Sequence, residues 1–252
     1  MVQLSKVWLG STGWFSGPSL RNVLHAPEFF ITRKMVQQWT KRSFDVLASG
    51  FGLLASAPLW ALIAVSIKLH DGAAVFYAQE RVGREGKRFN SWKFRSMAPD
   101  ADARFGPLQA GECDPRVTCV GRWLRATALD ELPQLWNIFK GDMSFVGPRA
   151  LRPEEIEIRE SMCTGARIMV GGGYDEAVLL EKIAGYEQRH RVTPGLTGLA
   201  QIYADRDIPR RHKFKYDLLY IKKQSFWLDL KLIALSFWIT FHGRWEHRGR
   251  KF

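Results

Sequence analysis

The longest uncharged stretch of the chain runs from Val46 to Ile67, and it constrains the fold more than any other feature of the sequence. Its 22 residues (VLASGFGLLASAPLWALIAVSI) are enough for a helix to cross the hydrocarbon core of a bilayer. A buried helix in the core of a large soluble protein would have a similar composition. Of these two alternatives we favour the membrane helix.

Two details of this segment argue against a simple crossing. Pro58 lies at its midpoint, where it removes a backbone hydrogen bond and kinks a helix. A crossing helix normally leaves one flank poor in Lys and Arg. Here both flanks are basic, with Arg33, Lys34, Lys41 and Arg42 before the segment and Lys68, Arg81, Arg84, Lys87 and Arg88 after it. The sequence therefore predicts a re-entrant helix that bends at Pro58 and returns to the cytoplasmic face.

The charge of the chain indicates an anionic partner. The 252 residues fit one domain, or one domain with an anchoring segment, and their formal net charge is +12. Nucleic acid, an anionic membrane surface and a phosphate-bearing substrate would all suit that charge. The 10 Trp and 16 Phe favour a membrane interface, where aromatic and basic residues occur together.

The first 40 residues are expected to form a loosely structured, variable leader with a short helix before Lys41, because Gly and Pro interrupt any long periodicity. No apolar core precedes a small-residue cleavage site, so no secretory signal is expected. Cys113, Cys119 and Cys163 are odd in number and match no metal-ligand spacing. We interpret them as three reduced structural thiols.

After the apolar segment the pattern predicts a mixed α+β fold that is mainly helical. Residues 71–100 contain short strand-like runs separated by Gly-containing turns, and residues 116–140 have apolar residues at helical spacing. Lys140-Gly141-Asp142 is expected to turn. Residues 151–190 are expected to be helical at both ends around Gly171-Gly172-Gly173. Residues 225–241 are apolar but contain Asp229 and Lys231, which favours an interfacial or core-packed helix.

The sharpest local signal is a pair of adjacent carboxylates, Asp130 and Glu131, shortly before Pro133. Pro is tolerated in the first turn of a helix, so a helix is expected to begin near Asp130. The free amides and dipole of such a helix attract phosphate, and carboxylates facing a diphosphate would require a divalent cation such as Mg²⁺ between them. The alternative is that Asp130 merely caps the helix.

Cationic side chains lie near this pair in the sequence and suit a diphosphate, because Arg binds phosphate through two parallel hydrogen bonds. Strand alternation over residues 89–96 would put Ser91, Lys93 and Arg95 on one face. Arg122 and Arg125 precede the pair, and Pro148-Arg149 follows a Gly-rich turn. Each cation alone is more often a solvated surface charge.

Ordered motifs across residues 41–242 resemble the bacterial sugar transferase family, the monotopic polyprenyl-phosphate phosphoglycosyltransferases. These motifs are KRSFDV (41–46), the apolar segment around Pro58, VFYAQERVGREGKRFNSWKFRSM (75–97), LRATALDELPQLWNIFKGDMSFVGPR (124–149), RHRVTPGLTGLAQIY (189–203) and KFKYDLLYIKKQSFWLDLKLI (213–233).

The resemblance implies a two-step reaction at the acidic pair. Asp130 would attack the β-phosphate of a UDP-sugar and release UMP, and polyprenyl phosphate would then take the phosphosugar from the aspartyl intermediate. Glu131 would support Mg²⁺ or the geometry, and the metal would be held by Asp130 and Glu131. Phosphate-binding roles are implied for Lys93, Arg95, Arg125, Thr127, Pro148 and Arg149.

The chain departs from the family pattern at two places. Ala57 precedes Pro58 where the family has Ser, and Ser56 stands one residue earlier, which leaves the geometry of the kink open. The family's Asn-Gly-Arg is replaced by Tyr203-Ala204-Asp205-Arg206, so the assignment of Arg206 to the donor site is weaker than those of Arg125 and Arg149.

The resemblance also implies an architecture: a leader (1–40), a re-entrant membrane helix (41–70) and a catalytic domain (71–252) on the cytoplasmic face of the bacterial inner membrane. A homodimer is possible. We expect Trp227, Trp238 and Trp245 to anchor the interface or to pack in the core, and Lys222, Lys223 and Arg244 to meet lipid phosphates. A nucleic-acid-binding protein is disfavoured because no binding module is recognisable, and a non-catalytic scaffold is disfavoured by the intact acidic pair.

Overall fold

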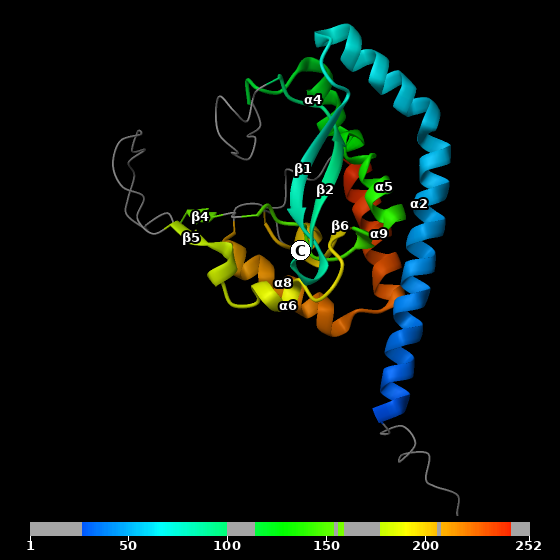
Figure 1. The fold of residues 1–252 in the computed structure, drawn as a ribbon, viewed down its shortest axis with the longest axis vertical. Helices are drawn as coiled ribbons and strands as arrows, with labels where there is room; N and C mark the ends of the chain where they lie inside the picture. Colours follow the sequence, from blue (N-terminus) through cyan, green and yellow to red (C-terminus); the bar gives the residue numbers. More distant parts are fainter. Residues whose placement is uncertain (1–26, 100–113, 154–155, 159–176, 206–207, 243–252) are drawn as a thin grey trace, which may run out of the picture. The chain divides into compact units, whose positions relative to one another are not determined.

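The computed structural model describes residues 27–99, 114–153, 156–158, 177–205 and 208–242. Contacts divide the chain into two units, residues 1–39 and residues 40–252. The first unit contains the beginning of helix α2 (Pro27–Asp71), which continues into the second unit and includes the helix expected before Lys41. The description below concerns the second unit (Figure 1).

Helix α2 is continuous through Pro58, and Figure 1 shows it curving over its C-terminal half. Pro58 has no N–H to donate to the carbonyl of Leu54. In the same turn the Ser56 hydroxyl donates to the Gly52 carbonyl at 2.6 Å and accepts from Trp60 Nε1 at 3.0 Å. Ser56, although it stands one residue before the position of the family's Ser, therefore still hydrogen-bonds the helix backbone near Pro58.

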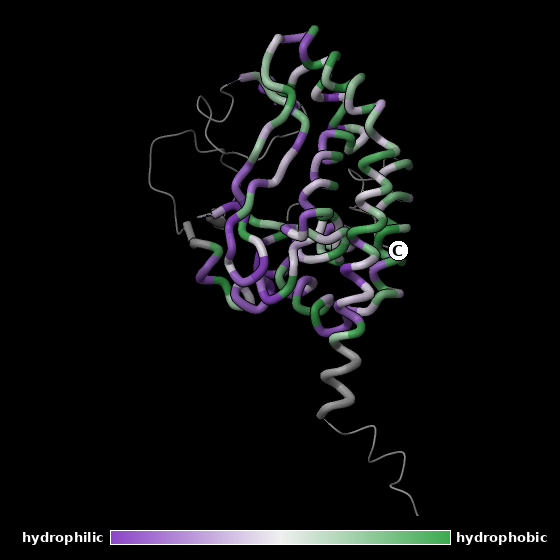
Figure 2. The backbone as a smooth tube through the Cα atoms, turned by 45° about the vertical axis from the view of Figure 1, so that its right-hand side comes forward, coloured by the Kyte–Doolittle hydropathy of each residue, from purple (hydrophilic) through white to green (hydrophobic). Residues whose placement is uncertain are grey.

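The apolar part of α2 is long enough to cross a membrane, and only 11% of its most apolar stretch is buried. This exposure contradicts a buried core helix. Figure 2 shows hydrophobic residues predominating along α2 and along α9 (Phe226–Phe241). The large exposed apolar side chains of the apolar segment are Leu47, Phe51, Leu54, Leu62 and Val65.

Two antiparallel strands follow α2, as the sequence predicted. Strand β1 (Phe76–Val82) and strand β2 (Arg88–Phe94) are joined by the short 3₁₀ turn η1 (Arg84–Gly86), where Gly86 has a φ of 76°. Tyr77 pairs with Lys93 and Arg81 pairs with Phe89, so their side chains share one face of the hairpin. Strand β2 ends at Phe94, and Arg95 therefore begins the next loop.

The helical character expected over residues 116–140 is confirmed, but as two helices separated by a 3₁₀ turn. The chain forms α4 (Cys119–Ala126), the 3₁₀ turn η2 (Leu129–Glu131) and α5 (Gln134–Lys140). The Thr127 hydroxyl bonds the Trp123 carbonyl at the end of α4, and Ala128 then turns the chain with a left-handed φ of 56°. Pro133 is the N-cap of α5, so Asp130 lies in the turn before the helix rather than in its first turn. The turn predicted at Gly141 is confirmed, with a φ of 107°.

A parallel pair of short strands forms the centre of the C-terminal half. Strand β3 (Ser144–Val146) pairs with β6 (Gly195–Thr197), and helices α7 (Leu199–Tyr203), α8 (Arg210–Lys223) and α9 complete the packing. A Cβ on Gly195 would overlap the Gly147 amide, and one on Gly147 would overlap the Thr193 carbonyl. Only glycine allows the two backbones to approach this closely.

The helices expected at both ends of residues 151–190 are largely wrong. Residues 156–158 and 177–179 form an antiparallel pair, β4 (Ile156–Ile158) and β5 (Ala177–Leu179), followed by the turn η3 (Leu180–Lys182) and the four-residue helix α6 (Tyr186–Arg189). Alternation in Ile156-Glu157-Ile158 and the β-branched Val178 favour strands. Gly171-Gly172-Gly173 lies outside the described residues. The expected α+β class with mainly helical content is confirmed in the described part of the chain.

Helix α9 is present as predicted over residues 225–241, and its tryptophans are exposed. Trp227 is 78% exposed and Trp238 is 60% exposed, which excludes core packing for both within this chain. Lys222 and Lys223, at the end of α8, are also exposed. Trp245 and Arg244 lie outside the described residues. Cys119 is exposed rather than a buried structural thiol, and Cys113 and Cys163 are not among the described residues.

Candidate active site

A buried amide places strand β2 beside the acidic pair. Asn137 of α5 is only 1% exposed, and its Nδ2 donates to the Asn90 carbonyl at 2.7 Å while its Oδ1 accepts from the Trp92 amide at 3.0 Å. Both bonds go to β2, so they fix the strand against the helix that follows the acidic pair. Lys93, the next residue of β2, is thereby held over η2.

Lys93 forms an ion pair with Glu131. The Lys93 and Glu131 side chains are 21% and 28% exposed, whereas Asp130 is 8% exposed. The ion pair shows that the structure brings the predicted lysine to the acidic dyad. In this structure the Lys93 ammonium neutralises the Glu131 carboxylate.

The two neighbouring carboxyls have opposite pKa shifts. Burial, together with the negative charge of Glu131, raises the pKa of Asp130 to about 6, although Lys93 and Arg125 act in the other direction. Burial would also raise the pKa of Glu131, but the charges of Lys93, Arg149 and Arg81 outweigh it and lower that pKa to about 2. Glu131 is therefore firmly ionised, and Asp130 is the more basic carboxylate.

Arg125 and Thr127 lie at the C-terminal end of α4. Arg125 is exposed, its Nε donates to the Ser96 hydroxyl at 3.0 Å, and its charge acts on Asp130. The Thr127 hydroxyl is used by the backbone, through the Trp123 carbonyl at 2.9 Å and the Leu124 carbonyl at 3.2 Å. Ala128, two residues before Asp130, then adopts its left-handed conformation, at a cost of about 1–2 kcal/mol.

Arg149 lies close enough to Glu131 for its charge to lower the pKa of that carboxyl. Its side chain is exposed, whereas Pro148 is buried and accepts a hydrogen bond from the Gly195 amide at 2.9 Å. The structure thus brings Lys93, Arg125 and Arg149 to the dyad. The half-buried Arg95 begins the loop after β2, where its amide donates to the Val75 carbonyl at 2.9 Å.

Sequence reasoning assigned Arg81 only to a basic flank, yet its charge also acts on Glu131. Arg81 Nη1 donates to the Ala150 carbonyl at 3.0 Å, so it joins β1 to the segment that carries Arg149. Applying the same alternation to β1 as to β2 would have placed Arg81 on the face of Lys93. Arg206 lies outside the described residues. Ala57 and Pro58 are exposed on α2 and belong to its apolar segment.

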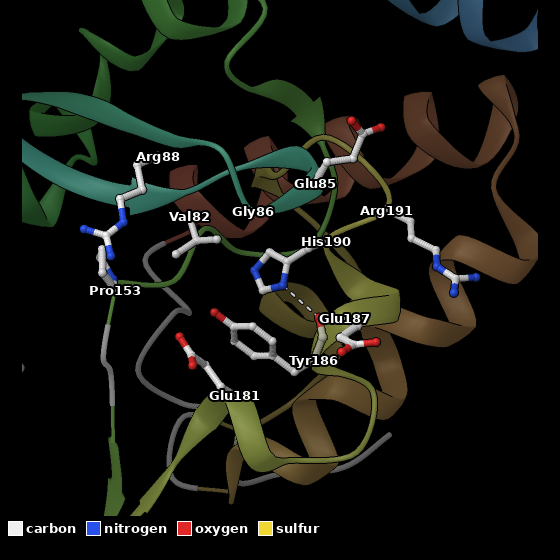
Figure 3. Close-up of a pocket in the computed structure, with 10 residues that line it drawn as sticks. All are labelled: Val82, Glu85, Gly86, Arg88, Pro153, Glu181, Tyr186, Glu187, His190 and Arg191. Carbon is white, nitrogen blue, oxygen red and sulfur yellow. Dashed lines mark hydrogen bonds between the residues drawn. The ribbon is translucent and has the colours of Figure 1, made fainter.

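A cavity of about 420 Å³ lies on the other face of the hairpin (Figure 3). Val82 and Arg88 pair in register and line it together, with Tyr186 and His190 on its floor. His190 Nδ1 lies 2.7 Å from the Tyr186 carbonyl, and burial together with the Arg189 charge lowers its pKa to about 4. None of the predicted site residues lines this cavity, so we place the candidate active site at the dyad.

The dyad fits a magnesium ion that shares its coordination with a substrate. Within the described ranges no group of three His, Cys, Asp or Glu side chains could hold a metal ion. Mg²⁺ is commonly bound by one or two carboxylates together with substrate phosphates and water. Asp130 and Glu131 supply two carboxylates, and the surrounding cations suit phosphate.

A family model described as bacterial sugar transferase matches residues 36–243. The chain belongs to the bacterial sugar transferase family. It is 40% identical over 216 residues to an undecaprenyl-phosphate glucose phosphotransferase of Komagataeibacter xylinus, a match covering 82% of this chain and 37% of the relative. It is 37% identical over 207 residues to the exopolysaccharide production protein ExoY of Rhizobium meliloti, covering 77% of this chain and 81% of that protein.

A third relative broadens the range of sugars in the family. The undecaprenyl-phosphate galactose phosphotransferase of Salmonella typhimurium is 32% identical over 214 residues, covering 79% of this chain and 40% of the relative. The chain thus matches less than half the length of the glucose and galactose phosphotransferases and most of the ExoY protein. This bacterial sugar transferase shares with all three the region that contains the dyad.

Proposed function

We propose that this bacterial sugar transferase moves a phosphosugar from a UDP-sugar to polyprenyl phosphate, such as undecaprenyl phosphate, and releases UMP. The observation that carries the proposal is the asymmetry of the dyad: a buried, more basic Asp130 beside a Glu131 held ionised by Lys93. The named activities of the glucose and galactose phosphotransferases support the same reaction class.

The first step of the proposed mechanism uses Asp130 as the nucleophile. A carboxylate oxygen of Asp130 attacks the β-phosphorus of the donor, the bond from that phosphorus to the bridging oxygen breaks, and UMP leaves with the bridging oxygen. Arg125, whose charge acts on Asp130, and Arg149, whose charge acts on Glu131, hold the phosphate oxygens. Glu131 has the lower pKa and is already paired with Lys93, so it is the poorer nucleophile.

In the second step a phosphate oxygen of the lipid attacks the phosphorus of the aspartyl phosphosugar. The bond from that phosphorus to Asp130 breaks, polyprenyl diphosphosugar forms, and Asp130 is again a free carboxylate. Mg²⁺, held by Asp130 and Glu131, would offset the negative charge of the phosphates. One carboxylate thus meets a water-soluble donor first and a lipid acceptor afterwards.

We infer a membrane arrangement that brings this site to the lipid headgroups. Helix α2 would enter the cytoplasmic leaflet of the bacterial inner membrane, bend at Pro58 and return, and Trp227 and Trp238 of α9 would lie at the interface. Lys34 and Lys68, on either side of the apolar segment, are then both labelled by a membrane-impermeant amine reagent from the cytoplasmic side only. Labelling of either lysine from the periplasmic side would instead require a full crossing.

A direct test of the reaction is UMP release by the purified chain with undecaprenyl phosphate, Mg²⁺ and a panel of UDP-sugars. UDP-glucose, UDP-galactose and their N-acetylated relatives cover the sugars that the sequence leaves open. We expect UMP release with at least one donor, accompanied by a lipid-linked diphosphosugar. Absence of UMP with every donor in the panel would reject the proposed reaction.

A further inference from the structure

The segment Val146–Arg149 begins at the last residue of β3 and ends at Arg149, the proposed phosphate-binding residue. Hydrogen bonds hold its backbone along its whole length. The Gly147 amide donates to the Thr197 carbonyl at 2.9 Å, and the Pro148 carbonyl accepts from the Gly195 amide at 2.9 Å. Both partners belong to β6. The side chain of Arg149 is exposed, so its position depends on how firmly this backbone is fixed.

A largely buried lysine side chain holds the Val146 end of the segment. Lys41 Nζ, from α2, donates to the Val146 carbonyl at 3.0 Å and pairs with Asp229 of α9 at 2.6 Å. The Tyr220 hydroxyl of α8 lies 3.1 Å from the same carbonyl and 2.7 Å from Asp229. The Lys41 and Asp229 side chains are 15% and 5% exposed, which leaves little water to compete for these bonds.

A second buried cation holds the other end. Arg189 Nη2 donates to the Arg149 carbonyl at 2.7 Å, and its Nε donates to Asp217 of α8 at 3.0 Å. The guanidinium lies 4.7 Å from the Phe214 ring centroid and is 2% exposed. His190 Nε2 is 3.4 Å from Arg189 Nη1 and, because His190 is neutral at pH 7, can accept from it. These contacts together fix the orientation of the Arg189 guanidinium.

The two ends of the Val146–Arg149 segment are held by the same arrangement of groups. In each, a cation bonds a main-chain carbonyl and is neutralised by a buried aspartate from one of the last two helices, Asp229 in α9 or Asp217 in α8. A buried ion pair contributes little net stability on average, because desolvation offsets the attraction. Two such pairs at the ends of one four-residue segment therefore suggest a role in geometry.

We propose that Lys41 and Arg189 are positioning residues that fix the Val146–Arg149 backbone and so aim Arg149 at the donor diphosphate. This inference rests on the proposed function, which supplies the diphosphate. Lys41 lies just before the proposed membrane segment of α2, so its bond to the Val146 carbonyl also connects that segment to the phosphate site. Lys cannot replace Arg189, since one ammonium cannot reproduce the planar fork that reaches Asp217 and the Arg149 carbonyl together.

The test is a double-mutant cycle on UMP release by the full chain. Arg189→Lys is expected to raise the KM for the UDP-sugar about tenfold with kcat within about twofold, because Arg149 binds the diphosphate in both ground and transition states. In an Arg149→Ala background the same substitution is expected to change KM by less than about twofold. An equal KM increase in both backgrounds, or none in either, would overturn the inference.

Two further variants and one structural readout keep this test decisive. Tyr220→Phe removes only a hydroxyl at the Val146 end of the segment. It is expected to raise the KM for the UDP-sugar about two- to threefold in the wild-type background and not in the Arg149→Ala background. This variant replaces Arg189→Lys in the cycle if Arg189→Lys does not fold. Arg42→Lys is the matched control, since Arg42 follows Lys41 but bonds the Ile138 and Phe139 carbonyls of α5. Its KM is expected to stay within about twofold of the wild-type value.

Hydrogen exchange separates this inference from the proposed reaction. The Gly147 and Gly195 amides are expected to exchange at least about tenfold faster in Arg189→Lys than in the wild type, and to be unchanged in Arg42→Lys. This result does not depend on which substrate the chain uses. Unchanged exchange at both amides would contradict the positioning role even if UMP release confirmed the reaction.

Discussion

Replacing Asp130 with Asn is expected to lower the rate of UMP release at least about 10⁴-fold, because a neutral amide of the same shape cannot form the aspartyl intermediate. The fold is expected to tolerate the change. Burial and the Glu131 charge raise the Asp130 pKa to about 6, so the folded state binds the proton more tightly than the unfolded chain does. That difference makes ionised Asp130 destabilising above pH 6, by about 3 kcal/mol.

Asp130→Asn should therefore unfold at a temperature equal to or above that of the wild type at pH 7.5, while losing activity. Thermal unfolding and UMP release measured on the same preparation check both effects. Asp71→Asn, an exposed change at the end of α2, is the control and is expected to retain wild-type activity. Wild-type activity in Asp130→Asn would remove Asp130 as the nucleophile.

Replacing Lys93 with Met is expected to lower kcat/KM about 10²-fold at pH 7 and to move its pH dependence upward. Of the neighbouring positive charges, that of Lys93 lowers the pKa of Asp130 and of Glu131 the most, so its loss raises both pKa values. In the wild type, kcat/KM should rise with pH through a midpoint near 6 as Asp130 ionises. In Lys93→Met the midpoint should lie at a higher pH.

A pH profile of kcat/KM from 5 to 9 measures both midpoints. Lys93→Arg keeps the positive charge and is expected to keep the midpoint near the wild-type value, although its longer side chain will lower the rate. Identical midpoints for wild type and Lys93→Met would show that the ion pair with Glu131 does not set the ionisation of the dyad.

The parts of the fold that could be predicted are those specified by local pattern. The length of the apolar segment specified α2, and alternation with Gly-containing turns specified the hairpin that carries Lys93. The turn at Gly141 followed from glycine's tolerance of positive φ. Each of these signals lies within a few residues of the element that it produces.

The environment of the dyad could not be predicted, because it depends on contacts between segments that are far apart in the sequence. Most residues of LRATALDEL are good helix formers, yet the chain turns at Ala128, where η2 packs against β2 and α4. Likewise, Arg189 and Asp217 are 28 residues apart, and nothing in either segment indicates the pairing. The sequence predicted that Lys93, Arg125 and Arg149 belong with the dyad, whereas the pKa shifts of the two carboxyls and the contacts that support the site required the structure.

The covalent intermediate is tested most directly by incubating the purified chain with radiolabelled UDP-sugar and Mg²⁺ in the absence of polyprenyl phosphate. The account predicts UMP release up to one equivalent per chain, with the label on the tryptic peptide 126–140, and its transfer to lipid when undecaprenyl phosphate is added. The label should be absent from Asp130→Asn. A wild-type chain that carries no label without acceptor, yet releases UMP once acceptor is present, would show direct transfer and contradict the aspartyl intermediate.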